Sequence, residues 1–418
     1  MKVLISSPFV DREAVGEPRW CYDLFQGISA KVETILIAQT PVNRSYRLAD
    51  AFPHSQVFEF EAWKLAFLSR RLNALVKPNY LKFYGFARDM IRHQVAPASI
   101  ACGHHFGPLG MRYPTPLQGT GIPYVMGPLG GSLPFPPGFS VTGRTDPWYY
   151  RLRDFDGLRF RFDPLLRGSY QEAAYLVGVA DYVEMLLASA GMKLKRFVTH
   201  SEIVAPLQTE HVEEIIAARA SRPGPVRFLV VSRLIYSKGV QFALSALAEA
   251  LHRLPDWRLD ILGDGPHRQA LQEQTTRLGL DGFVRFHGHV KRSDVDAFYR
   301  DADVFLFPSV REPSGAVIFE ALSWGLPIIG ARYGGPANHI SDAYGYRIPV
   351  DDVATFEAGL ADATIALATS PQKRQTMGRS ALDAARTQHA MPAMVDFFLD
   401  LYRQISQEAG GSKSLELR

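Results

Sequence analysis

Two acidic residues, Glu312 and Glu320, are separated by seven residues and stand beside a Pro-Ser-Gly turn. The apolar run Val304–Phe307 predicts a buried strand, and Pro313–Gly315 predicts a loop that opens a helix. Loops at the carboxyl ends of strands present free backbone N–H groups, which is where α/β sheets bind phosphate or sugar. The two carboxylates are therefore expected to hold hydroxyl groups beside a bound anion. Surface acids at a chance spacing are the alternative.

Two basic residues, Arg233 and Lys238, follow a second predicted strand, Phe228–Ser232, and precede a helix that begins at Val240. A diphosphate bound at this turn would meet two cations and the amides of the helix together. Surface salt bridges are the alternative. If the two strands belong to one sheet, we expect the two cations and the two acids to line a single pocket at its carboxyl edge.

Both groups lie in motifs, E-x7-E and R-L-x-x-x-K-G, that resemble those of the retaining glycosyltransferases of the GT-B fold. The resemblance is in particular to glycosyltransferase family 4, also called glycosyl transferases group 1, and it covers residues from about 226 to 351. It implies that Arg233 and Lys238 neutralise the donor diphosphate. It also implies that Glu312 contacts the donor sugar and that Glu320 holds the ribose hydroxyls of the nucleotide.

The resemblance implies further contacts with the donor from the loops that follow the predicted strands. Ser314 stands where many family members carry an aromatic residue. The first loop holds Gly16 but no G-x-G-x-x-G fingerprint, which argues against an NAD enzyme. An ordinary turn glycine is the alternative at that position. Besides Glu320, the expected donor-binding positions are Gly16, Gly263, Gly265, Val290, Ser314, Gly315, Ala316 and Val317.

A histidine pair, His104 and His105, follows a short predicted strand, Ala98–Cys102, at an edge where ligands bind. In many family 4 enzymes a histidine of the equivalent loop approaches the donor sugar, so the resemblance implies a catalytic role for one of the two. The sequence does not say which, and a structural pair is the alternative. Adjacent histidines do not place two zinc ligands on one helical face, and no further Cys or His follows at ligand spacing, so no metal site is expected.

These groups must be positioned by two domains, because 418 residues exceed what one core usually organises and a strand-loop-helix order occurs in both halves. We predict an α/β fold of the GT-B type, with two Rossmann-like domains facing each other across a cleft. The expected divisions are an acceptor domain at 1–206, a linker at 207–225, a donor domain at 226–392, a helix crossing back at 393–408 and a tail at 409–418.

Composition and charge favour a soluble protein of a reducing compartment, with 47% hydrophobic and 21% charged residues, a net charge of +4 and only two cysteines. No run approaches a signal peptide or the roughly 20 apolar residues of a membrane span, so a cytoplasmic location is expected. Two basic and aromatic stretches, residues 63–93 and 148–167, indicate contact with the inner face of an anionic membrane. Solvated helices that cover the sheet are the alternative. No nucleic-acid module accompanies the stretches.

Together these features predict a metal-independent glycosyltransferase of the hexosyltransferase type. It would need no cofactor and would move a sugar from a UDP- or GDP-linked donor to an acceptor hydroxyl, with retention of configuration. The acceptor is expected in polysaccharide or lipid-linked glycan assembly. A sugar-nucleotide epimerase of the same architecture and a non-catalytic nucleotide-sugar-binding protein are the alternatives. The donor base, the sugar and the acceptor are left open by the sequence.

Overall fold

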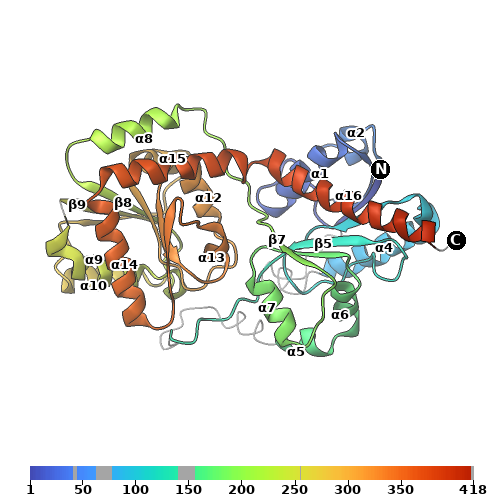
Figure 1. The fold of residues 1–418 in the computed structure, drawn as a ribbon, viewed down its shortest axis with the longest axis horizontal. Helices are drawn as coiled ribbons and strands as arrows, with labels where there is room; N and C mark the ends of the chain where they lie inside the picture. Colours follow the sequence, from blue (N-terminus) through green and yellow to red (C-terminus); the bar gives the residue numbers. More distant parts are fainter. Residues whose placement is uncertain (41–44, 63–77, 140–155, 255, 416–418) are drawn as a thin grey trace. The chain divides into compact units, whose positions relative to one another are not determined.

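The computed structural model describes residues 1–40, 45–62, 78–139, 156–254 and 256–415. The chain forms two compact units (Figure 1). Unit 1 consists of Met1–Ser132, Leu152–Glu202 and Met391–Arg418, and unit 2 consists of Leu133–Arg151 and Ile203–Ala390. Each unit is built on a parallel sheet with helices packed against it, so the predicted α/β fold of two Rossmann-like domains is confirmed.

Unit 1 contains a sheet of seven described strands in the order β3-β2-β1-β4-β5-β6-β7, and all neighbouring strands run parallel. The central strands are apolar and almost entirely buried, which is the pattern expected of a parallel sheet covered on both faces. The strands are β1 Lys2–Ser7, β2 Glu33–Thr40, β3 Gln56–Glu61, β4 Cys102–His105, β5 Tyr124–Leu129, β6 Tyr175–Gly178 and β7 Phe197–Thr199.

Among the helices of unit 1, the C-terminal helix α16 (Met391–Leu415) packs against α1 (Glu17–Ser29) and reaches β4 and β5. The last segment of the chain therefore helps to build the core of the N-terminal sheet. The remaining described helices of the unit are α2 Leu48–Ala51, η1 Pro97–Ser99, α4 Pro78–Gln94, α5 Asp156–Phe162, α6 Pro164–Gln171 and α7 Tyr182–Ser189.

The basic and aromatic stretch at 63–93 is described only from residue 78, and residues 148–155 of the second stretch likewise lie outside the described part. Within α4, Tyr80 and Phe83 are buried in unit 1, where both rings lie near His105. Because these two rings are buried in the core of unit 1, they do not face a membrane. This agrees with the alternative that α4 is a helix that covers the sheet.

Unit 2 contains a second parallel sheet, in the order β10-β9-β8-β11-β12-β13. Because β8 and β11 are neighbours, the two strands that precede the predicted cations and acids end at the same edge. The strands are β8 Val226–Val231, β9 Trp257–Leu262, β10 Val284–Gly288, β11 Val304–Phe307, β12 Ile328–Ala331 and β13 Gly345–Ile348.

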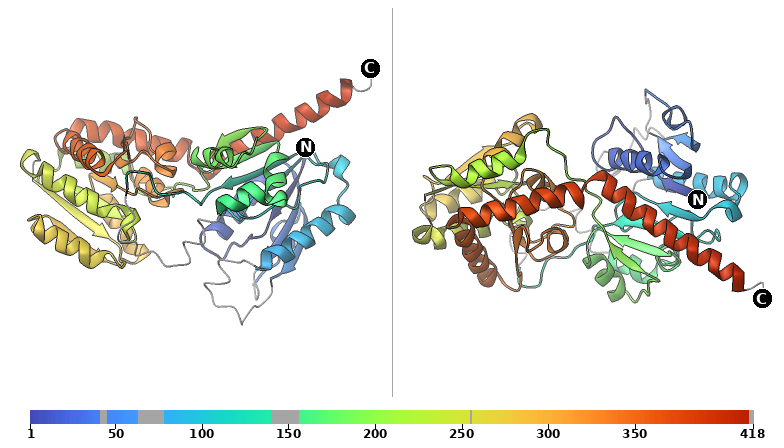
Figure 2. Two further views of the ribbon diagram at one scale, coloured as in Figure 1. Left: turned by 90° about the horizontal axis from the view of Figure 1, so that it is seen from below. Right: turned by 45° about the horizontal axis from the view of Figure 1, so that its top comes forward.

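Helices pack against both faces of the sheet in unit 2 (Figures 1 and 2). Alternate residues of β8 enter opposite cores, Phe228 and Val230 on one face and Leu229 on the other. One face packs against α9 (Val240–Ala250), α10 (Arg268–Arg277) and α14 (Val353–Ala368). The other packs against α8 (Val212–Ser221), α11 (Arg292–Asp301), α12 (Ala316–Ser323) and α15 (Pro371–Thr387). The short elements η3 (Tyr236–Lys238), η4 (Leu251–Arg253) and α13 (Gly335–His339) complete the unit.

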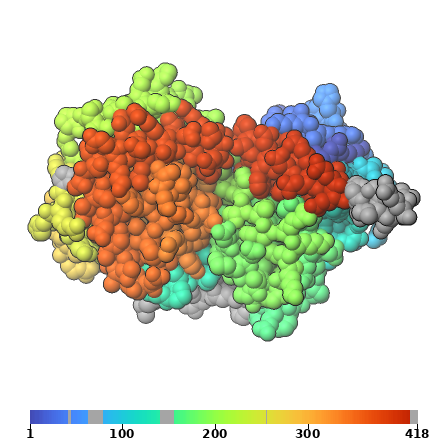
Figure 3. Space-filling model, viewed as in Figure 1, coloured from blue at the N-terminus to red at the C-terminus, as the bar shows by residue number. Residues whose placement is uncertain are grey.

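In the space-filling view, α14 and α15 form much of the visible surface of unit 2 (Figure 3).

Candidate functional site

Two of the predicted site residues, Lys238 and Glu312, form an ion pair at the carboxyl edge of the sheet in unit 2. Lys238 ends the turn η3 after β8, and Glu312 lies in the loop after the neighbouring strand β11. Their side chains are only 14% and 15% exposed, so water screens the pair less than it would screen a surface pair. Motifs that are 74 residues apart in the sequence are thus joined by a direct contact.

The backbone around Lys238 requires a glycine at the next position. Gly239 has a φ of +70°, and a Cβ there would lie 1.9 Å from the carbonyl oxygen of Pro308, which follows β11. The Val310 amide also donates to the Ser237 carbonyl oxygen at 3.0 Å. The glycine of the R-L-x-x-x-K-G motif therefore lets the Lys238 turn lie directly on the loop that carries Glu312.

Arg233 follows β8 by two residues, and its side chain is exposed. Across the described part of the chain it has no ion pair or hydrogen bond to an acid. A guanidinium without a partner at the carboxyl edge is available for an anion, so the position agrees with the expected contact to a diphosphate.

The loop glycines Gly263 and Gly265 pack against backbone rather than open space. A Cβ at Gly263 would lie 1.8 Å from the Ser232 carbonyl oxygen, and one at Gly265 would lie 2.3 Å from the Leu234 carbonyl oxygen. They let the loop after β9 contact the turn that carries Arg233. Their predicted contact with the nucleotide stays a prediction, and the structure gives them this packing function.

Glu320, on α12, is held by two residues of α11. One carboxylate oxygen accepts a hydrogen bond from Arg292 Nη1 at 2.6 Å, and the other accepts one from the Tyr299 hydroxyl at 3.0 Å. Burial raises the pKa of Tyr299 well above its ordinary value, so this hydroxyl keeps its proton at neutral pH. Among the described residues no ion pair or hydrogen bond links Glu320 to Lys238 or Glu312. Glu320 therefore forms a second polar centre.

The remaining predicted donor-binding residues lie at the ends of helices or strands. Gly315 is the N-cap of α12 with a φ of +92°, and Ser314, Ala316 and Val317 flank it. Val290 follows β10 and packs beside the core formed with α11. In unit 1, Gly16 is the N-cap of α1 with a φ of +75°, and a Cβ there would meet nothing within 4 Å. The positive φ therefore explains why a glycine is favoured at position 16, whereas crowding by neighbouring atoms does not.

The histidine pair departs from the predicted geometry. Residues 97–99 form η1, and the strand β4 runs from Cys102 to His105, so both histidines lie within the strand and do not follow it. Their exposures are 0% and 3%. The sequence predicts a loop at His104 and His105 because two adjacent polar residues are typical of loops. Polar residues can nevertheless lie in a core when hydrogen bonds satisfy them.

Both histidine rings make their hydrogen bonds inside unit 1. His104 Nε2 donates to the Gly127 carbonyl oxygen at 2.9 Å, and its Nδ1 accepts from the Tyr402 hydroxyl of α16 at 2.5 Å. His105 contacts the Tyr80 hydroxyl at 3.1 Å and Ser6 Oγ at 3.2 Å. Neither ring has a nitrogen left for a sugar. The predicted catalytic role of His104 or His105 is therefore wrong, and the alternative of a structural histidine pair is supported.

We expect the pair to make unit 1 sensitive to acid. Burial lowers the pKa of His104 and of His105 to about 3, below the value near 6.5 of an unfolded histidine. The unfolded state therefore binds more protons between these values, and the free energy of unfolding should fall by about 2 kcal/mol per histidine from pH 7 to pH 5. Amide hydrogen exchange of β4 and β5 at pH 7 and at pH 5 measures this fall in the free energy of unfolding. His104→Gln keeps a donor for Gly127 and should remove about half of the loss; an unchanged pH dependence would contradict the prediction.

The chain is similar in sequence and in fold to known glycosyltransferases. Residues 211–382, all within unit 2, match the family model described as Glycosyl transferases group 1. We call residues 211–382 the group 1 domain after the family model that they match. Among solved structures, a glycosyltransferase from Rickettsia africae aligns with a TM-score of 0.57 at 14% identity over 97% of this chain and 98% of that one. HepE of Anabaena in complex with UDP aligns with a TM-score of 0.55 at 16% identity over 99% and 100%. At these identities the likeness shows the fold, which is that of the GT-B glycosyltransferases.

Similar curated proteins match only part of this chain. Glycogen synthase of Mycobacterium tuberculosis is 33% identical over 166 residues, 40% of this chain and 39% of that protein. The alpha-monoglucosyldiacylglycerol synthase of Streptococcus pneumoniae is 28% identical over 186 residues, 43% and 42% of the two chains. The lipopolysaccharide core biosynthesis glycosyltransferase LpsD of Rhizobium meliloti is 32% identical over 191 residues, 44% and 52% of the two. The chain thus spans about half, or less, of the length of these relatives.

Unit 2 also includes a segment outside residues 211–382 that was predicted to belong to the first domain. Residues Leu133–Phe139, which we call the strap, belong to unit 2. Phe139 is buried at 2% exposure, and its ring packs edge-to-face against Phe242 and Phe356. The helices α9 and α14 thus anchor the end of the strap in the core of the group 1 domain.

The strap contacts the Glu312 loop through Arg311. Arg311 Nε donates to the Leu133 carbonyl oxygen at 2.7 Å, and its guanidinium lies 4.8 Å from the centre of the Phe135 ring. The Glu312 carbonyl oxygen accepts from the Gly335 amide at 2.9 Å, which holds the loop from its other side. Arg311 is therefore a positioning residue that motif spacing missed. A basic residue immediately before the first acid was the available signal, but its partner is 178 residues away.

The described residues contain no group of three or more His, Cys, Asp or Glu side chains arranged to hold a metal ion. Across the same part of the chain, no helix combines the length and apolar character needed to cross a membrane.

Proposed function

We propose that the protein is a glycosyltransferase that moves a sugar from a nucleotide-sugar donor to an acceptor hydroxyl. The observation that carries the proposal is the half-buried Lys238–Glu312 pair beside the exposed Arg233 at the carboxyl edge of a group 1 domain. Cations at the end of parallel strands are placed to bind a diphosphate, and the adjacent carboxylate is placed to accept hydrogen bonds from sugar hydroxyls.

The proposed reaction breaks the bond between the anomeric carbon and the diphosphate and forms a bond to the acceptor oxygen on the same face. Negative charge then grows on the leaving diphosphate, where Lys238 and Arg233 stabilise it. The leaving phosphate oxygen takes the proton of the acceptor hydroxyl. The two side-chain cations supply charge to the diphosphate, so this hexosyl transfer is proposed to proceed without a metal. The acceptor attacks on the face that the diphosphate leaves, so the configuration is proposed to be retained.

Glu312 has two functions in this proposal. Before the donor binds, it keeps the Lys238 ammonium oriented in a partly buried site. When the diphosphate takes over the ammonium, the carboxylate is released to accept hydrogen bonds from the donor sugar. The strap contact through Arg311 would hold the loop in place during this exchange.

The donor is proposed to be UDP- or GDP-linked, and UDP is the first nucleotide to test because the HepE structure of the same fold contains it. A glycan or lipid-linked acceptor is proposed because the similar proteins include a lipopolysaccharide core glycosyltransferase and a glucosyldiacylglycerol synthase. Peripheral contact with an anionic membrane is supported by the exposed apolar residues Leu158, Phe162 and Leu165 of α5 and α6.

The experiment that tests the function combines the protein with UDP- and GDP-sugars, with and without glycan and glycolipid acceptors. A transferase releases nucleoside diphosphate and adds one hexose to the acceptor, and NMR of the product gives the anomeric configuration. Conversion of the donor without an acceptor would instead indicate an epimerase. Binding without any product would indicate the non-catalytic alternative.

Glu320→Gln is expected to weaken nucleotide binding, because a neutral amide accepts weaker hydrogen bonds from ribose and leaves Arg292 without its partner. We expect the Kd for UDP in isothermal titration to rise by about tenfold, with a smaller change in the turnover number. Glu273→Gln on α10, where the acid contacts Gln269, is the matched control. An unchanged Kd for Glu320→Gln would remove the ribose function from this residue.

A further inference from the structure

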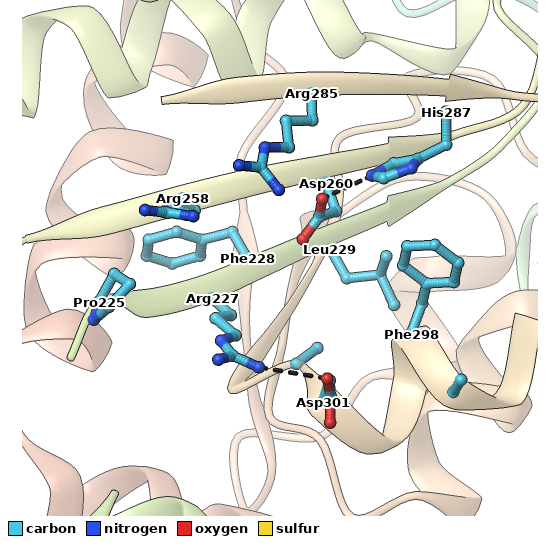
Figure 4. Close-up of a pocket in the computed structure, with 12 residues that line it drawn as sticks. Pro225, Arg227, Phe228, Leu229, Arg258, Asp260, Arg285, His287, Phe298 and Asp301 are labelled. Carbon is cyan, nitrogen blue, oxygen red and sulfur yellow. Dashed lines mark hydrogen bonds and ion pairs between the residues drawn. The ribbon is translucent and has the colours of Figure 1, made fainter. Parts of the chain in front are cut away.

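A cavity of about 530 Å³ opens on one face of the sheet in unit 2, over β8, β9 and β10 and beside α11 (Figure 4). Its volume is in the range of small-molecule sites. Arg227, near the start of β8, lines the cavity, whereas Arg233 follows the other end of that strand. At roughly 3.3 Å per residue these positions are about 20 Å apart along the strand direction. The Arg227 end of the cavity is therefore separate from the carboxyl edge described above, whereas His287, next to the last residue of β10, lies at the end nearer to that edge.

Side chains along a strand point alternately to the two faces of the sheet, and the strands here place polar side chains on the face of the cavity. In β9, Trp257, Leu259 and Ile261 enter the core, while Arg258 and Asp260 lie on the cavity side. In β10, Arg285 and His287 likewise line the cavity. Parallel strands normally carry apolar residues on both faces, because helices cover both. Burial in a core therefore does not explain the polar face.

Two acids in the cavity wall already have partners. Asp301 pairs with Arg227 at 3.2 Å, and Asp260 pairs with His287 at 2.6 Å, as the dashed lines in Figure 4 show. Among the residues that the structure describes, the side chains of Arg258 and Arg285 form no ion pair or hydrogen bond, and both residues are exposed. The cavity therefore contains two guanidinium groups that form no ion pair with an acid, although Asp260 lies opposite Arg285 in the register.

The register places like charges side by side in the β8 and β9 pair only. Arg258 is the direct partner of Arg227 across the β8 and β9 pair, and Arg285 is the partner of Asp260 across the next pair. Directly opposed like charges destabilise a sheet pair. A bound dianion would offset this repulsion, and guanidinium groups bind the oxygens of a phosphate in a forked geometry.

The wall beside the arginines is apolar. Phe298 of α11 and Leu229 of β8 line the same opening, and the His287 ring lies 4.7 Å from that of Phe298 (Figure 4). A ligand that fits these features has one doubly charged group for the arginines and an uncharged body for the apolar wall. A phosphate monoester carries a charge of about −1.5 to −2 at neutral pH.

We propose that this cavity binds a phosphate monoester, with the phosphate between Arg258 and Arg285 and the esterified group toward Phe298. The site is independent of the proposed transfer reaction. A free sugar phosphate and the head group of a phosphorylated lipid share this chemistry, so the experiment needs separate arms for the two sources.

The test is isothermal titration with glucose 6-phosphate, with glucose as the uncharged comparison, and flotation with vesicles of phosphatidylcholine with and without phosphatidic acid. We expect one of two results. Saturable binding of glucose 6-phosphate would identify a free sugar phosphate as the ligand, and flotation that requires phosphatidic acid would identify a lipid head group. Arg258→Ala and Arg285→Ala should each raise the Kd, or the lipid concentration for half-binding, by about tenfold. Arg277→Ala on α10, which removes the same charge from the other face of the sheet, should leave binding unchanged.

Two further measurements keep this cavity distinct from the carboxyl edge. Lys238→Ala should bind glucose 6-phosphate or vesicles as the wild type does, and UDP should displace neither. Melting curves of the arginine variants check that they are folded. Absence of phosphate-dependent binding in both arms would overturn the proposal, as would equal losses in Arg277→Ala and Arg285→Ala or displacement by UDP.

Discussion

Replacing Lys238 by alanine is expected to lower kcat/KM for sugar transfer by about 100- to 1000-fold, the usual cost of removing one charged or hydrogen-bonding group from the place where transition-state charge develops. The ammonium lies in a site that is 14% exposed, where water cannot replace it efficiently. The variant also leaves Glu312 without its partner next to the bound diphosphate. Repulsion between these anions should weaken donor binding in addition to slowing the reaction.

Steady-state kinetics with saturating acceptor measure this effect, and a melting curve of each variant separates it from unfolding. Glu312→Gln removes the repulsion, so the double variant should lose less activity than the two single losses combined. Lys373→Ala, at an exposed lysine of α15 in the same unit, is the control. If Lys238→Ala retained wild-type kcat/KM while binding the donor, the diphosphate function of this residue would be wrong.

Arg219→Leu is expected to lower the free energy of unfolding of unit 2 by about 3 kcal/mol or more, because it leaves several buried carbonyl groups without donors. Arg219 lies in α8 at 8% exposure. Its guanidinium donates to the Tyr299 and Arg300 carbonyl oxygens at 2.9 Å each and to the Trp324 carbonyl oxygen at 2.8 Å. These carbonyls lie at the ends of α11 and α12, where helices leave carbonyl groups unpaired.

The effect should extend to the candidate site, because Arg219 joins the two helices that carry Glu320 and its partners. Burial lowers the pKa of Arg219 to about 10, so the side chain is still charged at neutral pH and also complements the negative ends of both helix dipoles. Urea unfolding, followed by hydrogen exchange in unit 2, measures the loss. Arg379→Ala, at an exposed arginine of α15, is the control. A loss below about 1 kcal/mol for Arg219→Leu would contradict the proposed link between the helices.

The sequence predicts the fold well where strands are buried on both faces. The apolar runs Phe228–Ser232 and Val304–Phe307 indicate strands that the structure places at Val226–Val231 and Val304–Phe307. The same reasoning fails at β4, because His104 and His105 are polar yet satisfied in the core by residues far away in the sequence, Tyr402 among them. A pattern of side-chain polarity cannot reveal a partner that only the fold brings near.

The candidate site shows the same division between local and distant information. The motifs indicate that Lys238 and Glu312 lie together, and the structure shows them in contact. Their functions in the reaction stay predictions. The contacts of Glu320 with Arg292 and Tyr299 were not predicted, because α11 precedes the E-x7-E motif and has no recognisable signature of its own. The strap was missed because residues 133–139 have no strand or helix periodicity.

Hydrogen exchange with and without saturating UDP tests most directly whether the carboxyl edge of the group 1 domain is the nucleotide site. We expect UDP to slow exchange in residues 232–239 and 312–320, which contain Arg233, Lys238, Glu312 and Glu320. We also expect Glu320→Gln to reduce this protection at a fixed UDP concentration. Protection confined to other segments, or none in these two at saturating UDP, would show that the nucleotide site lies elsewhere.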